Sequence, residues 1–301
     1  DGKLAMPKRG VKLQCWMGYI DAGVHDMGIY TVDSVEWGGT PDTITVKAKS
    51  ADMKGSLKSG RTQSYHDKKL GEIAKEVATR HELELAMTDY LMSIDVGHID
   101  QTDESDLHLL TRLCWQFGAV VNVKHGKLLI FQPYENKTVS GQPLTLTVLK
   151  RDKGDQFRFS IEDRQGDIDN VQATYHDAKQ AKKVTVNTDK DGQKPKRLKG
   201  NFKDEKTATA AANAEKKRIE GEQGKFSINC AFGYPAISTE SPIELQGFKV
   251  EIDSLKWTVD KATHSYSKSQ GLTTQLDLTA PINNEFGAKP DDKSKDEKTK
   301  K

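Results

Sequence analysis

The sequence predicts a mainly β protein in which a small α/β module is inserted between two β regions. Strand-like alternation of apolar and polar residues fills residues 1–60 and returns after residue 136. Helix-like spacing of apolar residues is concentrated between residues 61 and 135. One alanine-rich stretch at about residues 205–220 predicts a single helix within the last β region. The 301 residues are enough for two or three domains.

The first region, residues 1–60, is predicted to be a meander of three strands. Residues 11–17 and 29–37 alternate in the manner of strands, and residues 43–48 form the returning strand after a Gly- and Pro-containing turn at residues 38–42. Three strands bury too little apolar surface to fold alone. We therefore expect this β domain to be partial, with further strands upstream of residue 1.

The second region, residues 61–135, is predicted to be an α/β module. Its first helix is indicated by apolar residues at helical spacing, with Asp67 as the expected N-cap: Leu70, Ile73, Ala74, Val77, Ala78 and His81. Its second helix is expected to begin at Thr102 or Asp103 and to end at Gly118. Residues 119–123 and 127–131 then alternate around His125-Gly126, which is typical of a hairpin.

The third region, residues 136–285, is predicted to be a second β domain with one helix at about 205–220. A Lys-rich segment, residues 177–203, is expected to be a hairpin or a mobile loop. Residues 286–301 carry mixed charges and almost no apolar residues, and we expect a disordered tail there. The predicted strands are residues 144–149, 156–161, 170–175, 225–231, 242–245, 255–263 and 272–278.

The composition gives reason not to expect several functional classes. The chain has 46 Lys and Arg against 44 Asp and Glu, a net charge of +2, which gives no electrostatic reason to expect direct binding of nucleic acid or membrane. No apolar run is long enough for a membrane helix, and no cleavable signal is visible. The three cysteines Cys15, Cys114 and Cys230 form no CxxC pair, and we expect small core residues in a reducing compartment.

A search for catalytic motifs yields one candidate metal site. Residues 98–108 hold two His and four carboxylates, so His98, Asp100 and Asp103 are candidate ligands for a divalent ion. The favoured interpretation is structural, because Asp103, Glu104 and Asp106 at a helix start would cap its free amides and complement its dipole. We therefore expect no catalytic residue, no metal and no cofactor.

Two further features have structural and functional interpretations. The Lys-rich residues 179–199 could contact nucleic acid, but a solvated loop is the favoured interpretation. The four tryptophans stand at apolar positions of predicted elements and are expected to anchor the core or an interface: Trp16, Trp37, Trp115 and Trp257.

Several runs resemble the phage late control protein D family, and the resemblance covers about residues 3–280. The specific part is central: residues 61–73, Ala78 to Leu83, and His98-Ile99-Asp100-Gln101-Thr102-Asp103-Glu104-Ser105-Asp106-Leu107. The continuation at residues 110–119 and 127–128 fits the same pattern. The flanking runs at residues 18–33, 243–248 and 271–276 also fit and are less specific.

The resemblance implies a baseplate hub of a contractile tail, related to the upper part of the VgrG spike of type VI secretion. Its implied fold is two related β-barrels joined by the α/β module, with residues 1–60 as the partial first barrel. It implies a homotrimer that connects a hexameric tail tube to a trimeric central spike, with further baseplate proteins and the tape measure as partners. The implied location is the virion tail, after assembly in the host cytoplasm. The family offers no catalytic residues, so the interface residues stay unassigned.

Three alternatives stay open. A hub of a contractile bacteriocin or another injection system has the same sequence features as a phage hub. A tail-associated metal-dependent or cell-wall hydrolase would require metal near His98 and Asp103. A nucleic-acid or carbohydrate binding module would bind through residues 179–199, with an affinity that falls steeply with salt.

Overall fold

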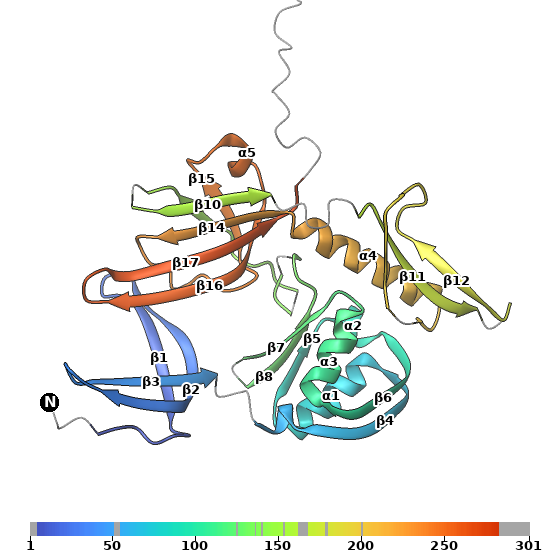
Figure 1. Ribbon diagram of the computed structural model, residues 1–301, viewed down its shortest axis with the longest axis horizontal. Helices are drawn as coiled ribbons and strands as arrows, with labels where there is room; N and C mark the ends of the chain where they lie inside the picture. Colours follow the sequence, from blue (N-terminus) through green and yellow to red (C-terminus); the bar gives the residue numbers. More distant parts are fainter. Residues whose placement is uncertain are drawn as a thin grey trace, which may run out of the picture.

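The protein is mainly β, as predicted. The computed structural model describes residues 5–50, 55–124, 126–135, 137–139, 141–152, 154–161, 168–177, 180–199 and 201–282. The described strands form five sheets, which are grouped into an N-terminal sheet, an α/β module, a six-stranded sheet and a lateral unit (Figure 1). The predicted tail, residues 286–301, lies outside the described residues, and the boundaries at residues 60/61 and 135/136 stay predictions.

The N-terminal sheet contains the three predicted strands in the order β1-β2-β3. These are β1 (Lys12–Tyr19), β2 (Gly23–Gly38) and β3 (Thr43–Ser50), all antiparallel. β2 begins at Gly23, earlier than the predicted Ile29. Its pairing has one irregularity opposite Cys15 and Trp16 and another between Val32 and Ser34. Such irregularities bend a strand and increase its twist, and β2 is visibly bent (Figure 1).

The α/β module contains two small sheets with helices packed between them. The antiparallel pair β4-β6 forms one sheet and β5-β8-β7 the other. The apolar sides of the helices enclose the first hydrophobic core, with Leu70, Leu110, Leu113 and Ile130 fully buried. The elements are η1 (Gly55–Lys58), β4 (Gly60–Lys69), α1 (Leu70–Arg80), β5 (Glu84–Met87), α2 (Asp89–Met92), β6 (Asp95–Ser105), α3 (Asp106–Trp115), β7 (Val120–Lys124) and β8 (Lys127–Phe131).

Both helix starts predicted in this module were wrong. The N-cap of α1 is Lys69, and Asp67 lies within β4 with a positive φ of 50°. The predicted start of the second helix at Thr102 or Asp103 lies inside β6, because pairing with β4 keeps the chain extended up to Ser105, opposite Gly60. The Ser105 hydroxyl is the N-cap of α3 and accepts a hydrogen bond from His108 N at 3.2 Å.

The six-stranded sheet has the order β10-β14-β17-β16-β15-β9 and encloses the second hydrophobic core. Phe226, Trp257 and Leu276 are buried there. The strand predicted at residues 144–149 is β9, which is shorter and begins later, at Thr147. The short helix α5 (Val250–Asp253) was not predicted. The strands are β9 (Thr147–Lys150), β10 (Gln156–Ile161), β14 (Gly224–Cys230), β15 (Pro242–Gln246), β16 (Trp257–Ser267) and β17 (Gly271–Ala280).

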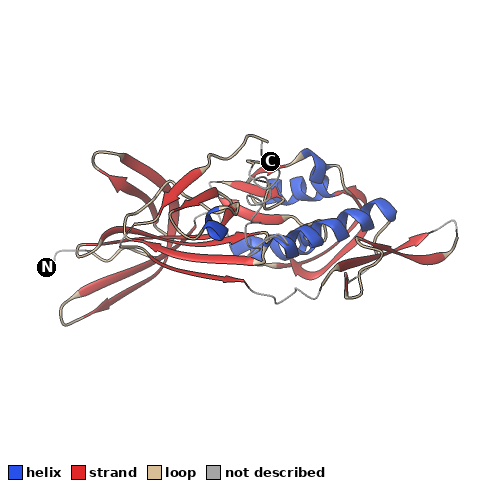
Figure 2. Ribbon diagram, turned by 90° about the horizontal axis from the view of Figure 1, so that it is seen from above, coloured by secondary structure: helices blue, strands red, loops and turns tan. Residues whose placement is uncertain are grey.

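The lateral unit consists of the sheet β12-β11-β13 covered by α4 (Glu205–Gly221), at the far end of the molecule from the N-terminal sheet (Figure 2). Its strands are β11 (Asn170–Asp177), β12 (Lys182–Asn187) and β13 (Pro195–Arg197). The Lys-rich segment, residues 177–203, therefore contains β12, which pairs antiparallel with β11. The predicted helix at about 205–220 is confirmed. Small buried residues such as Ala208, Ala211 and Ala212 pack α4 closely on β11. Within the described residues, no helix is both long and apolar enough to span a membrane.

Candidate assembly surface

The N-terminal sheet has almost no hydrophobic core of its own. Within described residues 5–50, Val32 is the only apolar side chain that is buried, at 2% exposure. The three hydrophobic clusters of the described chain are all formed by residues from Leu57 onward. An isolated three-stranded sheet needs a packed apolar face to be stable. This sheet therefore depends on contacts that the chain does not provide within the described residues.

One face of the N-terminal sheet carries a continuous row of apolar side chains, which we call the Trp37 face. Trp37 pairs with Ile44 and Val35 with Val46, so these four side chains lie on the same side of β2 and β3. Trp37 is 64% exposed and Val46 37% exposed. The row continues on β1 at Leu13, which pairs with Tyr30. Exposed neighbouring apolar groups of this kind mark a contact surface.

The opposite face, which we call the Trp16 face, carries exposed apolar side chains among polar ones. Gln14 and Gly18 lie on the same side of β1 as Trp16, and their partners on β2 are Ile29 and Val24. Trp16, Val24 and Ile29 are 52%, 65% and 44% exposed, whereas the partner of Trp16 is the polar residue Asp26. A sheet that is solvated on one side normally alternates apolar and polar faces. Exposed apolar side chains therefore occur on both faces of this sheet.

Tyr19 at the end of β1 attaches this sheet to the six-stranded sheet. Its ring is stacked on Phe232, with centroids 4.5 Å apart and planes inclined by 8°. Its hydroxyl accepts a hydrogen bond from Gly233 N at 2.8 Å and lies 3.4 Å from the carbonyl oxygen of Leu272. A side chain at Gly233 would collide with Leu272, so the close approach requires glycine there. Ile20 and Tyr266 are exposed.

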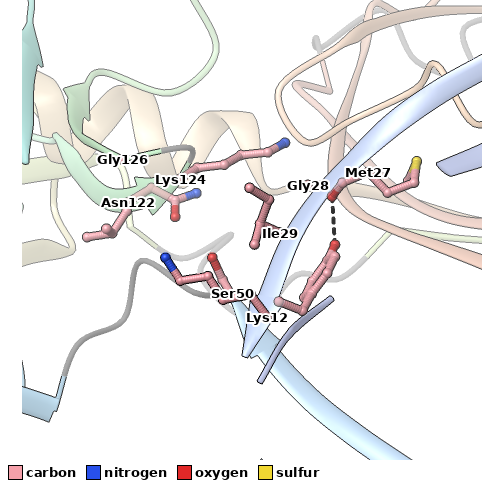
Figure 3. Close-up of a pocket in the computed structure, with 10 residues that line it drawn as sticks. Lys12, Met27, Gly28, Ile29, Ser50, Asn122, Lys124 and Gly126 are labelled. Carbon is pink, nitrogen blue, oxygen red and sulfur yellow. Dashed lines mark hydrogen bonds between the residues drawn. The ribbon is translucent and has the colours of Figure 1, made fainter. Parts of the chain in front are cut away.

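A cavity of about 410 Å³ separates the N-terminal sheet from the α/β module (Figure 3). Lys12 and Ile29 line it from the sheet, and Asn122 and Lys124 from β7. Figure 3 shows these lining side chains around the gap, with Ser50 of β3 also contributing. The sheet and the module therefore meet loosely, which leaves the Tyr19 junction as the specific attachment that the structure describes.

All three predicted metal candidates lie on β6, but only His98 and Asp100 are in contact with each other. His98 Nε2 lies 3.1 Å from Asp100 Oδ2. Asp103 lies at the opposite end of the β4-β6 pair, beside Gly60. A residue that the sequence did not single out, His66 on β4, lies with its Nδ1 2.9 Å from His98 Nδ1. Among the described residues, no group of three or more His, Cys, Asp or Glu has an arrangement suited to a metal ion.

Of the three acidic residues expected at the start of the second helix, Asp106 lies in the first turn of α3, whereas Asp103 and Glu104 lie in β6. Glu104 and Asp106 take part in side-chain networks. Glu104 accepts hydrogen bonds from Arg112 at 2.8 and 3.0 Å. These hydrogen bonds lower the pKa of Glu104. Asp106 is buried and accepts from Arg80 at 2.7 Å, besides lying 2.8 Å from His81 Nε2.

Opposing effects act on the pKa of Asp106. Burial raises it, but hydrogen bonds from Gln101, Arg80 and His81 together outweigh burial and lower the pKa below its usual range. The carboxylate is therefore charged in the folded module and holds α1, β6 and α3 together through its partners.

The tryptophans and cysteines are only partly in the core. Trp257 is buried and donates its indole N–H to the Ile252 carbonyl at 3.0 Å. The core alternative was wrong for Trp16, Trp37 and Trp115, because their side chains are more than half exposed, whereas an interface role stays a prediction for them. The Arg218 guanidinium lies over the Trp115 ring, with its Cζ 4.8 Å from the ring centroid.

All three cysteines are free thiols. Cys114 and Cys230 are buried as predicted, and burial raises the pKa of each thiol to about 12. Cys15 is only half-buried, because β1 has no packed core beside it.

Comparison with known proteins identifies related sequences. The family model described as phage tail baseplate hub (GPD) matches residues 8–270. The probable baseplate hub protein of Escherichia phage 186 is 33% identical, over 97% of this chain and 85% of that protein. The probable baseplate hub protein of Escherichia phage P2 is also 33% identical, over 92% of this chain and 81% of that protein.

Two solved structures share the fold. The tail protein from Neisseria meningitidis MC58 has a TM-score of 0.61 at 12% identity, covering 88% of this chain and 83% of that one. The 43 kDa tail protein of prophage MuSo2 from Shewanella oneidensis has a TM-score of 0.64 at 15% identity, covering 92% and 85%. At these identities the likeness concerns the fold alone.

Proposed function

Because this chain belongs to the phage tail baseplate hub family, we propose that it assembles as a homotrimeric ring. In this proposal the ring connects a hexameric tail tube to a trimeric central spike, and it is needed for tail assembly and for DNA delivery. A tail baseplate hub acts through its surfaces, so the proposal concerns which surfaces meet which partners.

The observation that supports this proposal is the N-terminal sheet with exposed apolar side chains on both faces and one buried apolar side chain. Burial of apolar surface contributes roughly 25 cal/mol per Å². Exposed Trp16 and Trp37 are large apolar side chains of the type that anchors subunit contacts. A ring of identical subunits provides a cover for such faces that the isolated chain lacks.

The proposed ring also addresses a symmetry mismatch. If the N-terminal sheet and the six-stranded sheet present similar faces, three subunits present six such faces around one axis. A threefold ring would then contact a sixfold tube by repeated, similar contacts. The proposed partners are the tube protein, the central spike, other baseplate proteins and the tape measure, in the virion tail after assembly in the host cytoplasm.

We propose no enzymatic role. The hydrolase alternative needs a metal shared by His98 and Asp103, and these residues lie at different ends of the β4-β6 pair. Loss of a measured cell-wall hydrolase activity in a His98→Ala variant would contradict the proposal.

The solution mass of the purified chain, measured by light scattering behind a sizing column, tests the trimer. A trimer of the 33.5 kDa chain is expected at about 100 kDa. The variant Trp37→Ser should shift the mass toward the monomer, because it removes the large exposed side chain of the Trp37 face. Tyr90→Ser, an exposed aromatic on α2 that is 46% exposed, is the matched control and should leave the mass unchanged.

A monomer from the chain alone would call for the same measurement on the chain co-expressed with its spike. A chain that stays monomeric in both experiments would contradict the proposed ring.

A further inference from the structure

We propose that His66 and His98 bind one Zn²⁺ ion, or a similar imidazole-preferring divalent ion, through their Nδ1 atoms. The site lies on the exposed side of the β4-β6 pair in the α/β module, away from the Trp37 and Trp16 faces. It is independent of the proposed trimer, since it needs only residues of one chain. It departs from the sequence-based expectation of no metal. Of the sequence-based candidates, His98 is a proposed ligand and Asp100 supports it, and His66 takes the place of Asp103.

The spacing of the two imidazoles suits a shared ion. The Nδ1 atoms are 2.9 Å apart. Two nitrogens bound to one ion, each at 2.0–2.1 Å, stand about 3.3–3.4 Å apart at a tetrahedral angle and about 2.9 Å apart at a right angle. No rearrangement of the strands is therefore needed to place an ion between them.

The ring orientation argues against a simple hydrogen bond between the two histidines. The ring centroids are 4.5 Å apart and the planes are inclined by 33°. An in-line N–H···N bond of this length between two five-membered rings would place the centroids about 5 Å apart, because a donor prefers to point straight at its acceptor. The shorter centroid distance means that the in-plane lone-pair directions are bent away from the line joining the nitrogens. Both Nδ1 atoms can then point toward one ion beside that line.

Asp100 and Ser64 supply the second layer of contacts that metal-binding histidines usually have. His98 Nε2 lies 3.1 Å from Asp100 Oδ2, which favours a proton on Nε2 and leaves Nδ1 with its lone pair free for a ligand bond. Ser64 Oγ donates to the other oxygen, Asp100 Oδ1, at 2.6 Å and fixes the carboxylate.

The backbone explains how His66 comes to lie beside His98. Tyr65 pairs with Ile99, but the next pair is Lys68 with Gly97, so β4 has two residues, His66 and Asp67, opposite one on β6. Asp67 has a φ of 50°. Extra residues of this kind re-aim a side chain and recur next to functional sites. Here the irregularity brings the His66 ring onto His98.

The proposed site is open to its surroundings. The side chain of His98 is 55% exposed, and so is that of Asp100. With two protein ligands, the remaining positions on the ion would be filled by water or by a donor group from another molecule. The ion would join β4 to β6 at the point where their backbone pairing is irregular.

Isothermal titration of the chain, without an affinity tag, with Zn²⁺ at pH 7.5 tests the site. We expect one ion per chain, and at least a tenfold loss of affinity in His66→Ala and in His98→Ala. Asp100→Asn should weaken binding by about 10- to 100-fold, as loss of outer-layer partners does. His176→Ala, an exposed histidine on β11, is the matched control and should bind as the native chain does.

Circular dichroism of each variant confirms that it is folded, which is expected because both histidine side chains are exposed. Absence of binding up to about 1 mM Zn²⁺, or equal affinity in the native chain and both histidine variants, would overturn the proposal and leave a stacked histidine pair only.

Discussion

The ring of Tyr19, the last residue of β1, lies almost parallel to that of Phe232, which follows β14 of the six-stranded sheet. The Tyr19 hydroxyl also bonds to the backbone of Gly233, 214 positions away. Stacked aromatic pairs contribute about 0.5–1.5 kcal/mol beyond their buried area. The hydroxyl adds a hydrogen bond to Gly233 N. This pair therefore attaches a sheet without its own core to a sheet that has one.

Removing the Tyr19 ring should loosen the N-terminal sheet without unfolding the rest. In Tyr19→Ala, backbone amides of residues 12–50 should exchange with deuterium faster, whereas those of the α/β module should keep their rates. Tyr19→Phe retains the stacking and should give an intermediate effect. Tyr266→Ala, which removes a ring that is 71% exposed, is the control. Unchanged exchange in Tyr19→Ala would mean that other contacts hold the sheet.

Removing Asp106 should destabilise the α/β module strongly. Its carboxylate is buried between Arg80 and His81, and its loss leaves buried donors without their acceptor. Breaking a buried charged pair in this way costs about 3–5 kcal/mol. The free energy of unfolding of Asp106→Ala should fall accordingly in urea titrations. Glu84→Ala, which breaks an exposed pair with Lys127, should cost less than about 1 kcal/mol. Similar losses in both variants would contradict the assigned role of the buried network.

The half-buried carboxyl of Glu240 should make the chain more stable when it is protonated. Burial, with a further contribution from the nearby charge of Asp260, raises the pKa of Glu240, although a hydrogen bond from Tyr134 N partly opposes this. A raised pKa means that the folded state binds the proton more tightly than the unfolded state. This group's contribution to stability therefore increases as the pH falls through its folded pKa, and it is unfavourable at neutral pH.

The variant Glu240→Gln tests this sign. It keeps an oxygen that can accept from Tyr134 N and removes the charge, so its free energy of unfolding at pH 7 should exceed that of the native chain. The difference should shrink as the pH is lowered toward the ordinary carboxyl value of 4.5. Chemical denaturation at a series of pH values measures both effects. A variant less stable than the native chain at pH 7 would show that the carboxylate has a favourable partner.

The apolar side of α3 should be among the most sensitive parts of the core. Leu110 and Leu113 are fully buried, and replacing either by alanine should cost about 2–5 kcal/mol, through lost burial and the cavity left behind. Leu146→Ala, at a position 54% exposed, is the control. Urea denaturation that finds Leu110→Ala and Leu113→Ala as stable as the native chain would show that the helix is packed differently.

Local signals predicted α1 and α4 well, because the determinants of a helix are spacing and propensity within the helix itself. The start of α3 was misplaced because the decisive interaction is not local. β6 stays extended through Asp103 only because β4, some forty residues earlier, pairs with it. The lateral unit was likewise missed, since nothing in the alternation of β11 or β12 says which sheet a strand joins.

The same reason limited prediction of the sites. His98 and Asp100 are two positions apart and were recognised as a pair, whereas His66 is 32 positions from His98 and enters through a strand irregularity that has no sequence signal. The tryptophans could be recognised as anchors, but alternation does not tell a core face from a face that awaits a partner. Trp257 and Trp37 both stand at apolar positions of predicted strands, but Trp257 is buried by the fold and Trp37 is exposed.

The single buried Val32 of the N-terminal sheet has a consequence for the life of the protein before assembly. When a segment is stabilised mainly by a partner, the fraction of chains in which it is ordered rises with the fraction that is bound to the partner. Unassembled copies would therefore expose residues 12–50 to cellular proteases, while assembled copies would protect them. Surplus chains could be degraded selectively, so the supply of hub would follow the supply of its partners without a dedicated regulator.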